Sequence, residues 1–133
     1  LGTVRGIEVY DDFAHHPTAI ETTLDGARKR LGERKLWAII EPRSNTMRMG
    51  SHKDGLAHSA RLADEVIWYQ PEGLDWDLQP VISASSNKAE VSRSLDDIIA
   101  RVVNEAGEGD AVVIMSNGGF GGLHQKLIRA LNA

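Results

Sequence analysis

The sequence predicts an α/β three-layer sandwich, with a mostly parallel, Rossmann-like sheet and helices on both faces. Short apolar or β-branched runs alternate along the chain with segments whose apolar residues recur at helical spacing. Some runs are apolar throughout, which is typical of parallel strands covered on both faces. A length of 133 residues, with 41% apolar and 26% charged residues, suits one domain spanning 1–133.

The first strand and the first helix frame a polar loop. Val4–Tyr10 mixes β-branched and aromatic residues and is predicted to be a strand or one arm of a hairpin. A helix is expected to begin at Pro17, which suits a first helical position, and to end before Gly32. Its apolar stripe has spacings of four, three and four, and consists of Ile20, Leu24, Ala27 and Leu31.

The remaining elements continue the alternation. Lys35–Glu41 contains the apolar run Leu-Trp-Ala-Ile-Ile and is predicted to be a central strand. The other expected elements are a helix over Lys53–Ala63, a strand over Glu65–Tyr69, a short strand at Val81–Ser83, a helix opened by Ser94 and Asp97, a strand over Asp110–Met115, and a last helix carrying Leu123, Leu127 and Leu131.

Composition excludes several classes of function. The net charge of −4 gives no excess of Lys and Arg, so we expect no nucleic-acid partner. Apolar runs of a few residues are too short to cross a bilayer, so we expect no membrane partner. The absence of cysteine excludes disulfides and thiol chemistry and is compatible with a cytoplasmic location. Because the first residue is Leu, we expect the chain to be a piece of a longer protein.

Polar loops follow the ends of three predicted strands, at Asp11–Pro17, Pro42–His52 and Ser116–Gly122. Ligands of open α/β sheets bind beyond the carboxyl ends of the strands. The sequence therefore predicts a ligand site formed by these three loops.

The first loop places two carboxylates and two imidazoles within six residues, just before a helix. A carboxylate can accept hydrogen bonds from ribose hydroxyls, and a histidine can donate to a phosphate or orient a substrate carboxylate. The alternative is a solvated turn capped by an aspartate. A metal site is less favoured, because adjacent histidines do not easily aim at one ion.

The other two loops suit anionic ligands. Arg43 and Arg48 offer paired donors that fit a carboxylate, as in an amino acid or a peptide, although loop arginines are also often solvated or paired with a surface acid. Ser116–Gly122 has four glycines, which let a backbone approach a ligand closely, or form a turn with Phe120 in the core. The phosphate-loop pattern Gly-x-x-x-x-Gly-Lys-Ser/Thr is absent from the chain, so this loop is not an NTPase site.

Asp12-Phe13-Ala14-His15-His16-Pro17 is similar to the motif that begins the C-terminal domain of the Mur ligases and the related folylpolyglutamate synthases. The doubled histidine followed by Thr18 resembles the branch of this family that acts on UDP-N-acetylmuramate. Within that branch, Glu41–Met47 and Ser116–Gly122 resemble the murein peptide ligases. The L-alanine ligases instead have a His-Arg-Tyr-Thr-Arg type of loop at the first of these positions.

The resemblance implies the C-terminal, closing domain of a three-domain, ATP-dependent amide ligase. Such enzymes activate a carboxylate as an acyl phosphate with ATP and Mg²⁺, and an amine then attacks. The murein peptide branch joins UDP-N-acetylmuramate to the recycled tripeptide L-alanyl-γ-D-glutamyl-meso-diaminopimelate in peptidoglycan recycling. The phosphate loop and the magnesium ligands would belong to a central domain, so this fragment is expected to be inactive alone.

Site residues follow from the same resemblance. Asp12 and His15 would contact the nucleotide, and His15 would also lie at the reacting groups as a catalytic residue. The incoming peptide would be bound by Arg43, Ser44, Asn45, Arg48, Ser116 and Asn117. No metal ligand is expected in this chain. The Asp-Asn-Pro-Arg motif of the diaminopimelate-adding ligase is missing, so the resemblance assigns no residue to the diaminopimelate end.

Three other interpretations are open. The first is the C-terminal domain of an L-alanine ligase of the same branch. The second is a phosphoacceptor receiver domain, which also has an acidic pair after its first strand. It requires an Asp after the third strand and a Lys after the fifth, where this chain has Gln70-Pro71 and Ser116-Asn117-Gly118. The third is a non-catalytic Rossmann-like binding module, in which changes at Asp12 or His15 would leave ligase activity intact.

Overall fold

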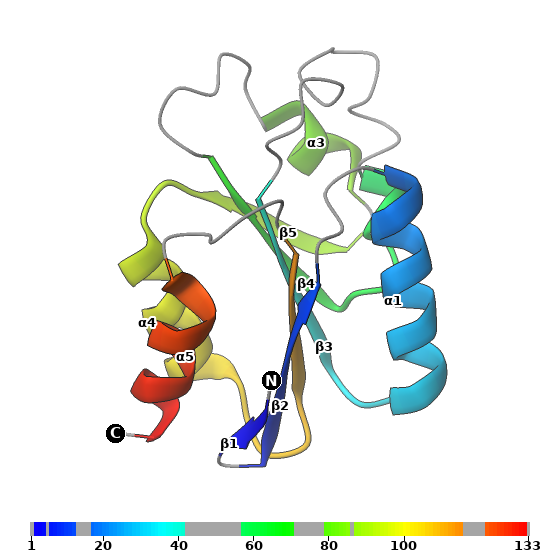
Figure 1. The fold of residues 1–133 in the computed structure, drawn as a ribbon. Coiled ribbons are helices and arrows are strands. Elements are labelled where there is room, and N and C mark those ends of the chain that lie inside the picture. The colour runs from blue at the N-terminus through cyan, green and yellow to red at the C-terminus, as the bar shows by residue number, and fades with distance from the viewer. Residues whose placement is uncertain are drawn as a thin grey trace.

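The computed structural model describes residues 2–4, 6–12, 17–41, 57–70, 79–85, 87–115 and 122–132. Helices cover both faces of one sheet, which confirms the predicted three-layer α/β class (Figure 1). The sheet has six strands in the spatial order β1 (Gly2–Val4), β2 (Ile7–Asp12), β6 (Ala111–Met115), β3 (Leu36–Ile40), β4 (Glu65–Tyr69) and β5 (Lys88–Ser92). All neighbouring strands are parallel except β1, which pairs antiparallel with β2.

The strand order contains one reversal. From β2 the chain proceeds to β3, β4 and β5, and it then returns to place β6 between β2 and β3. Because crossover connections are right-handed, this reversal places the helices of the return on the other face. Figure 1 shows α1 (Pro17–Leu31) on one face of the sheet, and α4 (Leu95–Glu105) and α5 (Leu123–Asn132) on the other.

Helix α1 follows the predicted bounds and the predicted stripe. Its four stripe residues are at most 5% exposed and pack against β3, β4 and β6. Gly32 ends the helix with a φ of +66°, in the left-handed region that glycine adopts without strain. Arg28 donates to the carbonyl oxygens of Gly32 at 3.0 Å and Arg34 at 2.8 Å, which satisfies acceptors left at the helix end.

The opposite face is covered by α4 and α5. Helix α4 begins as predicted: the Ser94 hydroxyl accepts a hydrogen bond of 3.3 Å from the backbone N–H of Asp97. In α5, Leu123, Leu127 and Leu131 are fully buried, as their spacing of four residues predicts. They pack with Ile98 and Val102 of α4 and with the apolar residues of β2, β3 and β6. The sheet thus has an apolar core on each face.

The prediction for Val81–Ser83 is wrong. These residues lie in a short helix, α3 (Gln79–Ala84), and the strand comes later, as β5 (Lys88–Ser92). Three β-branched and polar residues are too few to specify a strand, and Val81 alone of the three is buried. Strand β5 escaped prediction because Lys-Ala-Glu-Val-Ser is a mixed sequence, as expected for a partly exposed edge strand.

The first strand also differs from its prediction. Strands β1 and β2 form a hairpin, with Gly6 at the turn before β2. Strand β2 continues through Asp11 and Asp12, which pair in register with Ile114 and Met115 of β6. The two aspartates are therefore the last residues of a strand and not part of a loop. In the helix predicted over Lys53–Ala63, the described residues begin at Ala57 and are helical over 57–59.

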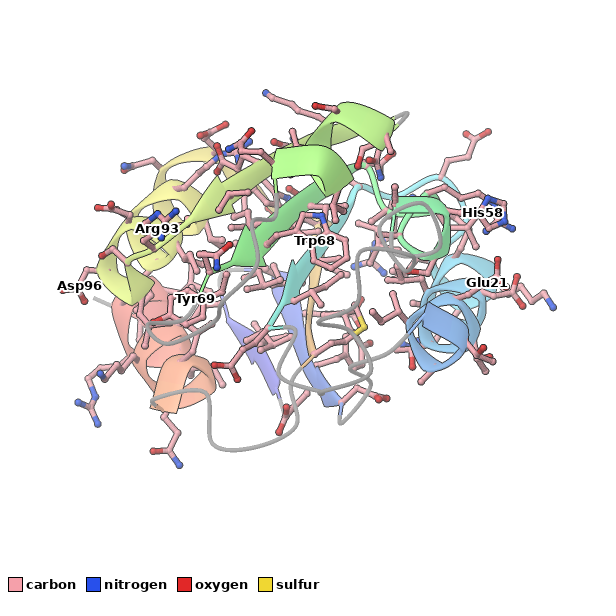
Figure 2. All side chains as sticks on the ribbon, turned by 90° about the horizontal axis from the view of Figure 1, so that it is seen from above. Glu21, His58, Trp68, Tyr69, Arg93 and Asp96 are labelled. Carbon is pink, nitrogen blue, oxygen red and sulfur yellow. The ribbon has the colours of Figure 1, made fainter. Side chains whose placement is uncertain are left out.

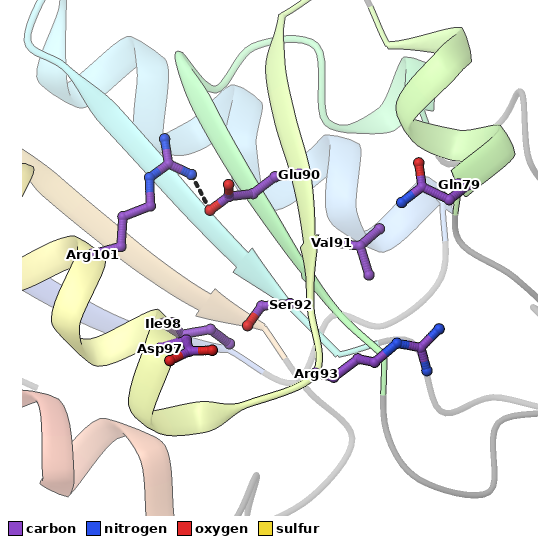
Figure 3. Close-up of a pocket in the computed structure, with 8 residues that line it drawn as sticks. All are labelled: Gln79, Glu90, Val91, Ser92, Arg93, Asp97, Ile98 and Arg101. Carbon is purple, nitrogen blue, oxygen red and sulfur yellow. Dashed lines mark hydrogen bonds and ion pairs between the residues drawn. The ribbon is translucent and has the colours of Figure 1, made fainter.

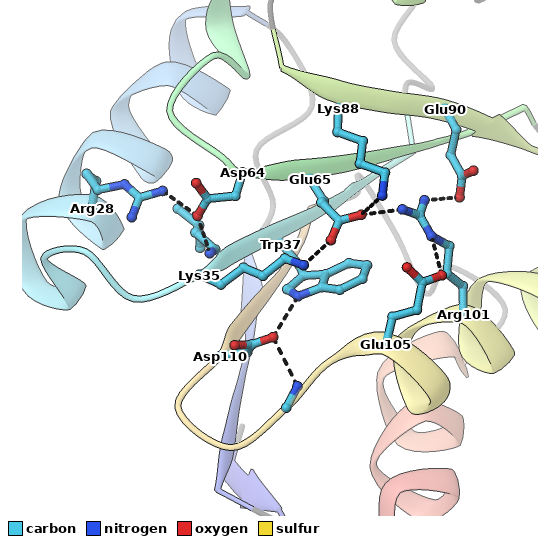
Figure 4. A network of polar contacts seen from close by, with 12 residues as sticks. Arg28, Lys35, Trp37, Asp64, Glu65, Lys88, Glu90, Arg101, Glu105 and Asp110 are labelled. Carbon is cyan, nitrogen blue, oxygen red and sulfur yellow. Dashed lines mark hydrogen bonds and ion pairs between the residues drawn. The ribbon is translucent and has the colours of Figure 1, made fainter.

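The amino ends of β3, β4 and β5 are joined by a polar network (Figure 4). The Glu65 carboxylate, only 4% exposed, contacts the ammonium of Lys35 and the guanidinium of Arg101, and lies 3.7 Å from the ammonium of Lys88. The Lys35 ammonium and the Arg101 guanidinium lie 4.8 Å and 5.4 Å from the centroid of the Trp37 ring. A buried charge with several partners of opposite sign is compensated, so we assign this edge of the sheet to stability.

Candidate functional site

The carboxyl ends of β2, β6 and β3 lie side by side. Met115 is in register with Asp12 on one side and with Ile40 on the other. The backbone N–H of Glu41 adds a further bond to the Met115 carbonyl oxygen at 2.9 Å. The three strands that precede the predicted loops are therefore neighbours, and the loops start from one edge of the sheet. We call this the carboxyl edge.

Asp12 lies at the carboxyl edge on the α1 face. Side chains alternate along a strand, so Asp12 shares its face with Tyr10, which packs against the α1 core, whereas the exposed Asp11 faces the other way. Beside Asp12, a hollow of about 320 Å³ separates β2 from the Thr22 and Gly26 side of α1. This placement leaves a carboxylate next to open space at the ligand end of the sheet.

The remaining predicted site residues lie outside the described part of the chain. They are His15, Arg43, Ser44, Asn45, Arg48, Ser116 and Asn117. The structure places the strand ends that flank them, at Asp12, Glu41 and Met115. Their roles stay predictions.

The carboxyl edge also holds polar residues that were not predicted. Glu41 and Gln70, 5% and 4% exposed, directly follow β3 and β4, and the Gln70 backbone N–H donates to the Ser92 carbonyl oxygen at 2.9 Å. Each comes immediately after an apolar strand, which is the signal that could have identified them. Figure 2 views this edge from above, with the buried Trp68 near the centre. The Trp68 indole N–H has no hydrogen-bond acceptor among the described residues.

A second hollow, of about 490 Å³, lies beside the edge strand β5 and is here called the β5 hollow (Figure 3). It is lined by residues of α3, of β5, of the connection from β5 to α4, and of α4. They include Gln79, Glu90, Ser92, Arg93, Asp97 and Arg101. Strand β5 is the edge strand beyond β4, so this hollow is separate from the hollow beside Asp12. Charged and polar side chains dominate the lining, which suits a polar ligand.

Two arginines line this hollow, Arg101 and Arg93, and they differ in how exposed they are to solvent. Arg101 is 16% exposed and contacts the carboxylates of Glu65, Glu90 and Glu105. Burial lowers the pKa of its guanidinium, but the hydrogen bonds and charges of these acids outweigh that effect and the pKa is raised. Arg101 is therefore a fixed, neutralised cation, whereas Arg93 is exposed.

In residues 2–4, 6–12, 17–41, 57–70, 79–85, 87–115 and 122–132, no group of three or more His, Cys, Asp or Glu is arranged to hold a metal ion. Over those ranges, no helix has the length and apolar character needed to cross a bilayer.

Comparison with known families identifies this arrangement. The family model described as "Mur ligase, glutamate ligase domain" matches residues 1–118. The chain belongs to the Mur ligase family. The Mur ligase C-terminal domain is therefore the fold of this chain, as the Asp12–Pro17 motif indicated, and the receiver interpretation is wrong.

Three relatives illustrate the match to the Mur ligase family. The UDP-N-acetylmuramate–L-alanyl-γ-D-glutamyl-meso-2,6-diaminoheptandioate ligase of Escherichia coli K12 is 48% identical over 131 residues, covering 98% of this chain and 29% of that protein. The murein peptide ligase of Psychrobacter arcticus superposes with a TM-score of 0.91 at 57% identity, covering 99% of this chain and 29% of that one. A domain attributed to a ligase of the same kind from Haemophilus ducreyi superposes with a TM-score of 0.83 at 42% identity. The match covers 98% of this chain and 95% of that one.

These coverages define the extent of the resemblance. The chain spans about 29% of the length of the curated E. coli relative and of the P. arcticus structure. The H. ducreyi structure is a domain of nearly the same extent as this chain, crystallised by itself. That domain of the H. ducreyi protein thus folds without the rest of its ligase.

Proposed function

We propose that this chain is the C-terminal domain of a three-domain, ATP-dependent amide ligase that joins UDP-N-acetylmuramate to the tripeptide L-alanyl-γ-D-glutamyl-meso-diaminopimelate. The observation that carries the proposal is the match over nearly the whole chain to a ligase named for this tripeptide, at 48% identity. The Glu41–Met47 and Ser116–Gly122 stretches support the tripeptide rather than L-alanine as the acceptor.

Asp12 is the described residue that supports a nucleotide contact. It ends β2 at the carboxyl edge, beside a hollow, where its carboxylate can accept hydrogen bonds from the hydroxyls of a ribose. ATP supplies the activation of the muramate carboxylate when it is bound. On this proposal, His15 follows Asp12 by three residues and orients the nucleotide and the reacting groups.

The peptide is assigned to the loops after β3 and β6. Arg43 and Arg48 bind peptide carboxylates through paired donors, and Ser44, Asn45, Ser116 and Asn117 hydrogen-bond to the peptide backbone. Holding the amine and the activated carboxylate together replaces a collision of two molecules by a reaction within one complex. Closure of the domain excludes water from that complex.

The described residues of this chain include no group of ligands for a magnesium ion. No cluster of three or more ligands is present in those ranges, so we assign no Mg²⁺ ligand and no metal-dependent step to them. The chain also lacks a phosphate loop, and we expect the isolated domain not to hydrolyse ATP.

The test is the choice of acceptor by the full-length enzyme. We expect ATP-dependent formation of the UDP-N-acetylmuramyl tripeptide, with kcat/KM for the tripeptide at least about 100-fold above that for L-alanine, a discrimination of about 2.7 kcal/mol. Product is measured by chromatography and ADP by a coupled assay. Equal or greater efficiency with L-alanine would assign the chain to the L-alanine branch instead, and no product with either acceptor would refute a ligase function.

A further inference from the structure

We propose that the outer edge of β5 pairs antiparallel with the β5 edge of a second copy of this chain, with Ala89 on the twofold axis. Such a pairing joins two sheets into one and forms a symmetric dimer. The inference concerns an interaction surface, and it does not depend on the proposed ligase function.

The outer edge of β5 carries backbone groups that lack partners. Strand β5 is the last strand of the sheet and pairs only with β4. The Ser92 carbonyl oxygen accepts from the Gln70 N–H on the β4 side, and successive peptide groups of a strand point in alternate directions. The N–H and C=O groups of Ala89 and Val91 therefore point outward. In the part of the chain that the structure describes, none of these four groups has a hydrogen-bond partner.

Space for another strand lies along this edge. The β5 hollow is lined by Gln79 of α3 and by Arg101 of α4, which Figure 3 shows on opposite sides of the β5 ribbon. Helices α3 and α4 pack on opposite faces of the sheet, so one hollow contacts both only by passing around the edge of β5. A strand that enters there meets the outward backbone groups of Ala89 and Val91.

The charges of β5 select one register for the pairing. Outward groups must form the hydrogen-bonded pairs, so Ala89 faces Ala89, Ala89 faces Val91, or Val91 faces Val91 of the second copy. The first register places Lys88 opposite Glu90 of the second copy, and symmetry repeats this pair. The second places Glu90 opposite Glu90, and the third places Glu90 opposite Ser92. Only the first register sets unlike charges against each other.

Both charged side chains are available at the edge. The side chain of Lys88 is 70% exposed and that of Glu90 is 45% exposed. They share the α4 side of the sheet, because the alternate residues Ala89 and Val91 pack against the α1 core. Arg101 divides its charge among three carboxylates, of which Glu90 is one. Within one copy the Glu90 charge is therefore only partly compensated, and Lys88 of a second copy compensates it further.

The extent of the pairing sets its strength. In the Ala89 register the paired segment runs from Asn87 to Val91, which is short for an interface. Stable dimers bury roughly 1,200–2,000 Å² or more, and one short strand pair buries less. We therefore expect a weak, reversible dimer.

The experiment measures association by sedimentation equilibrium, for this 133-residue chain and for the full-length enzyme, at concentrations up to about 1 mM. A domain of nearly the same extent from H. ducreyi crystallises without the rest of its ligase, which makes the short chain suitable. Lys88→Glu and Glu90→Lys each place like charges opposite one another in the proposed register. Lys35→Glu and Glu105→Lys are matched controls, because they alter partners of Glu65 and Arg101 away from the edge.

We expect wild type to dimerise reversibly, and each single variant at the edge to raise the dimer dissociation constant at least about tenfold. An equal mixture of Lys88→Glu and Glu90→Lys should form a mixed dimer about as tight as wild type, because one chain then carries two acids and the other two bases at the paired positions. Native mass spectrometry identifies the mixed dimer. The controls should associate as wild type does.

A second measurement tests the register. The chain has no cysteine, so Ala89→Cys and Val91→Cys each introduce a single thiol. In the proposed register the two Cα atoms at position 89 are about 5.5 Å apart, within the range for a disulfide, whereas those at position 91 are about 14 Å apart. Mild oxidation should therefore link Ala89→Cys into a dimer and leave Val91→Cys monomeric.

Four results would overturn the proposal. The first is a wild-type chain that stays monomeric at every concentration, which would leave the edge to a strand of a different protein. The second is a pair of edge variants that dimerise as tightly as wild type, and the third is a mixture of these variants that forms no mixed dimer. The fourth is faster oxidative linkage of Val91→Cys than of Ala89→Cys.

Discussion

Glu8 illustrates how single residues on the rim of the sheet contribute to stability. Its carboxylate, 26% exposed, accepts a hydrogen bond from the Tyr10 hydroxyl and lies 2.5 Å from the Arg34 guanidinium. These two partners, in that order, hold the pKa of Glu8 below its ordinary value of 4.5. The same hydrogen bond raises the pKa of Tyr10. Glu8 therefore stabilises the folded chain in its charged form.

The pH dependence of this contribution has a definite sign. Because the Glu8 pKa is lower in the folded chain, its contribution is complete above pH 4.5 and is lost as the pH falls through the folded value. We expect Glu8→Gln to lower the free energy of unfolding by about 0.5–1 kcal/mol at pH 7, and the difference from wild type to shrink toward pH 3. Urea unfolding at a series of pH values measures it.

The control for this change is Glu33→Gln. Glu33 is exposed and has no ion-pair partner in the ranges that the structure describes. Its replacement should leave stability unchanged at every pH. A Glu8→Gln difference that stays constant or grows as the pH falls would contradict the assigned role of Glu8.

At the scale of elements, the turn between β1 and β2 depends on Gly6. Its φ of +78° lies in the left-handed region, and an added Cβ would lie 2.4 Å from Cγ of Glu108. Gly6→Ala should therefore lower the free energy of unfolding by about 1–3 kcal/mol, through backbone strain and displacement of the Glu108 side chain. Thermal and urea unfolding measure the loss.

Gly26 provides the matched glycine in a helix. It lies within α1, and an added Cβ would have no neighbour within 4 Å among the described atoms. Gly26→Ala should raise the free energy of unfolding by about 0.5–1 kcal/mol, because alanine loses less conformational freedom in a helix. If both alanine variants shift stability in the same direction, the conformational argument for Gly6 is wrong.

The elements that could be predicted are those in which the spacing of apolar residues in the sequence matches the residues that are buried in the structure. The stripe of α1, the apolar run of β3 and the leucines of α5 are all buried, because their periodicity matches the geometry of the element. Strand β5 could not be identified in this way. It is an edge strand with only Ala89 and Val91 facing a core, and neither marks a strand in a sequence.

The candidate site was predictable only in part for a related reason. The sequence shows which loops follow strands, and from that the carboxyl edge could be expected. The insertion of β6 between β2 and β3, which brings the three strand ends before these loops side by side, depends on long-range pairing that no local pattern contains. The hollow beside β5 likewise forms only because β5 is the edge strand next to α4.

At the scale of the whole molecule, the two ends of the sheet differ in character. The amino ends carry the Glu65 network, in which the buried carboxylate is compensated by Lys35, Lys88 and Arg101. The carboxyl edge carries Asp12, Glu41, Gln70 and the hollow beside Asp12. This division between a stabilising end and a ligand-binding end follows the general rule for parallel sheets. On the proposed function, the carboxyl edge is the surface that the domain presents to substrates.

The most direct test of this account compares Asp12→Ala and Arg43→Ala in the full-length enzyme, by steady-state KM for ATP and for the tripeptide. We predict that Asp12→Ala raises the KM for ATP about tenfold with little change for the tripeptide, and that Arg43→Ala does the reverse, since each removes a contact to one substrate. Wild-type turnover and wild-type KM for both substrates in both variants would contradict it.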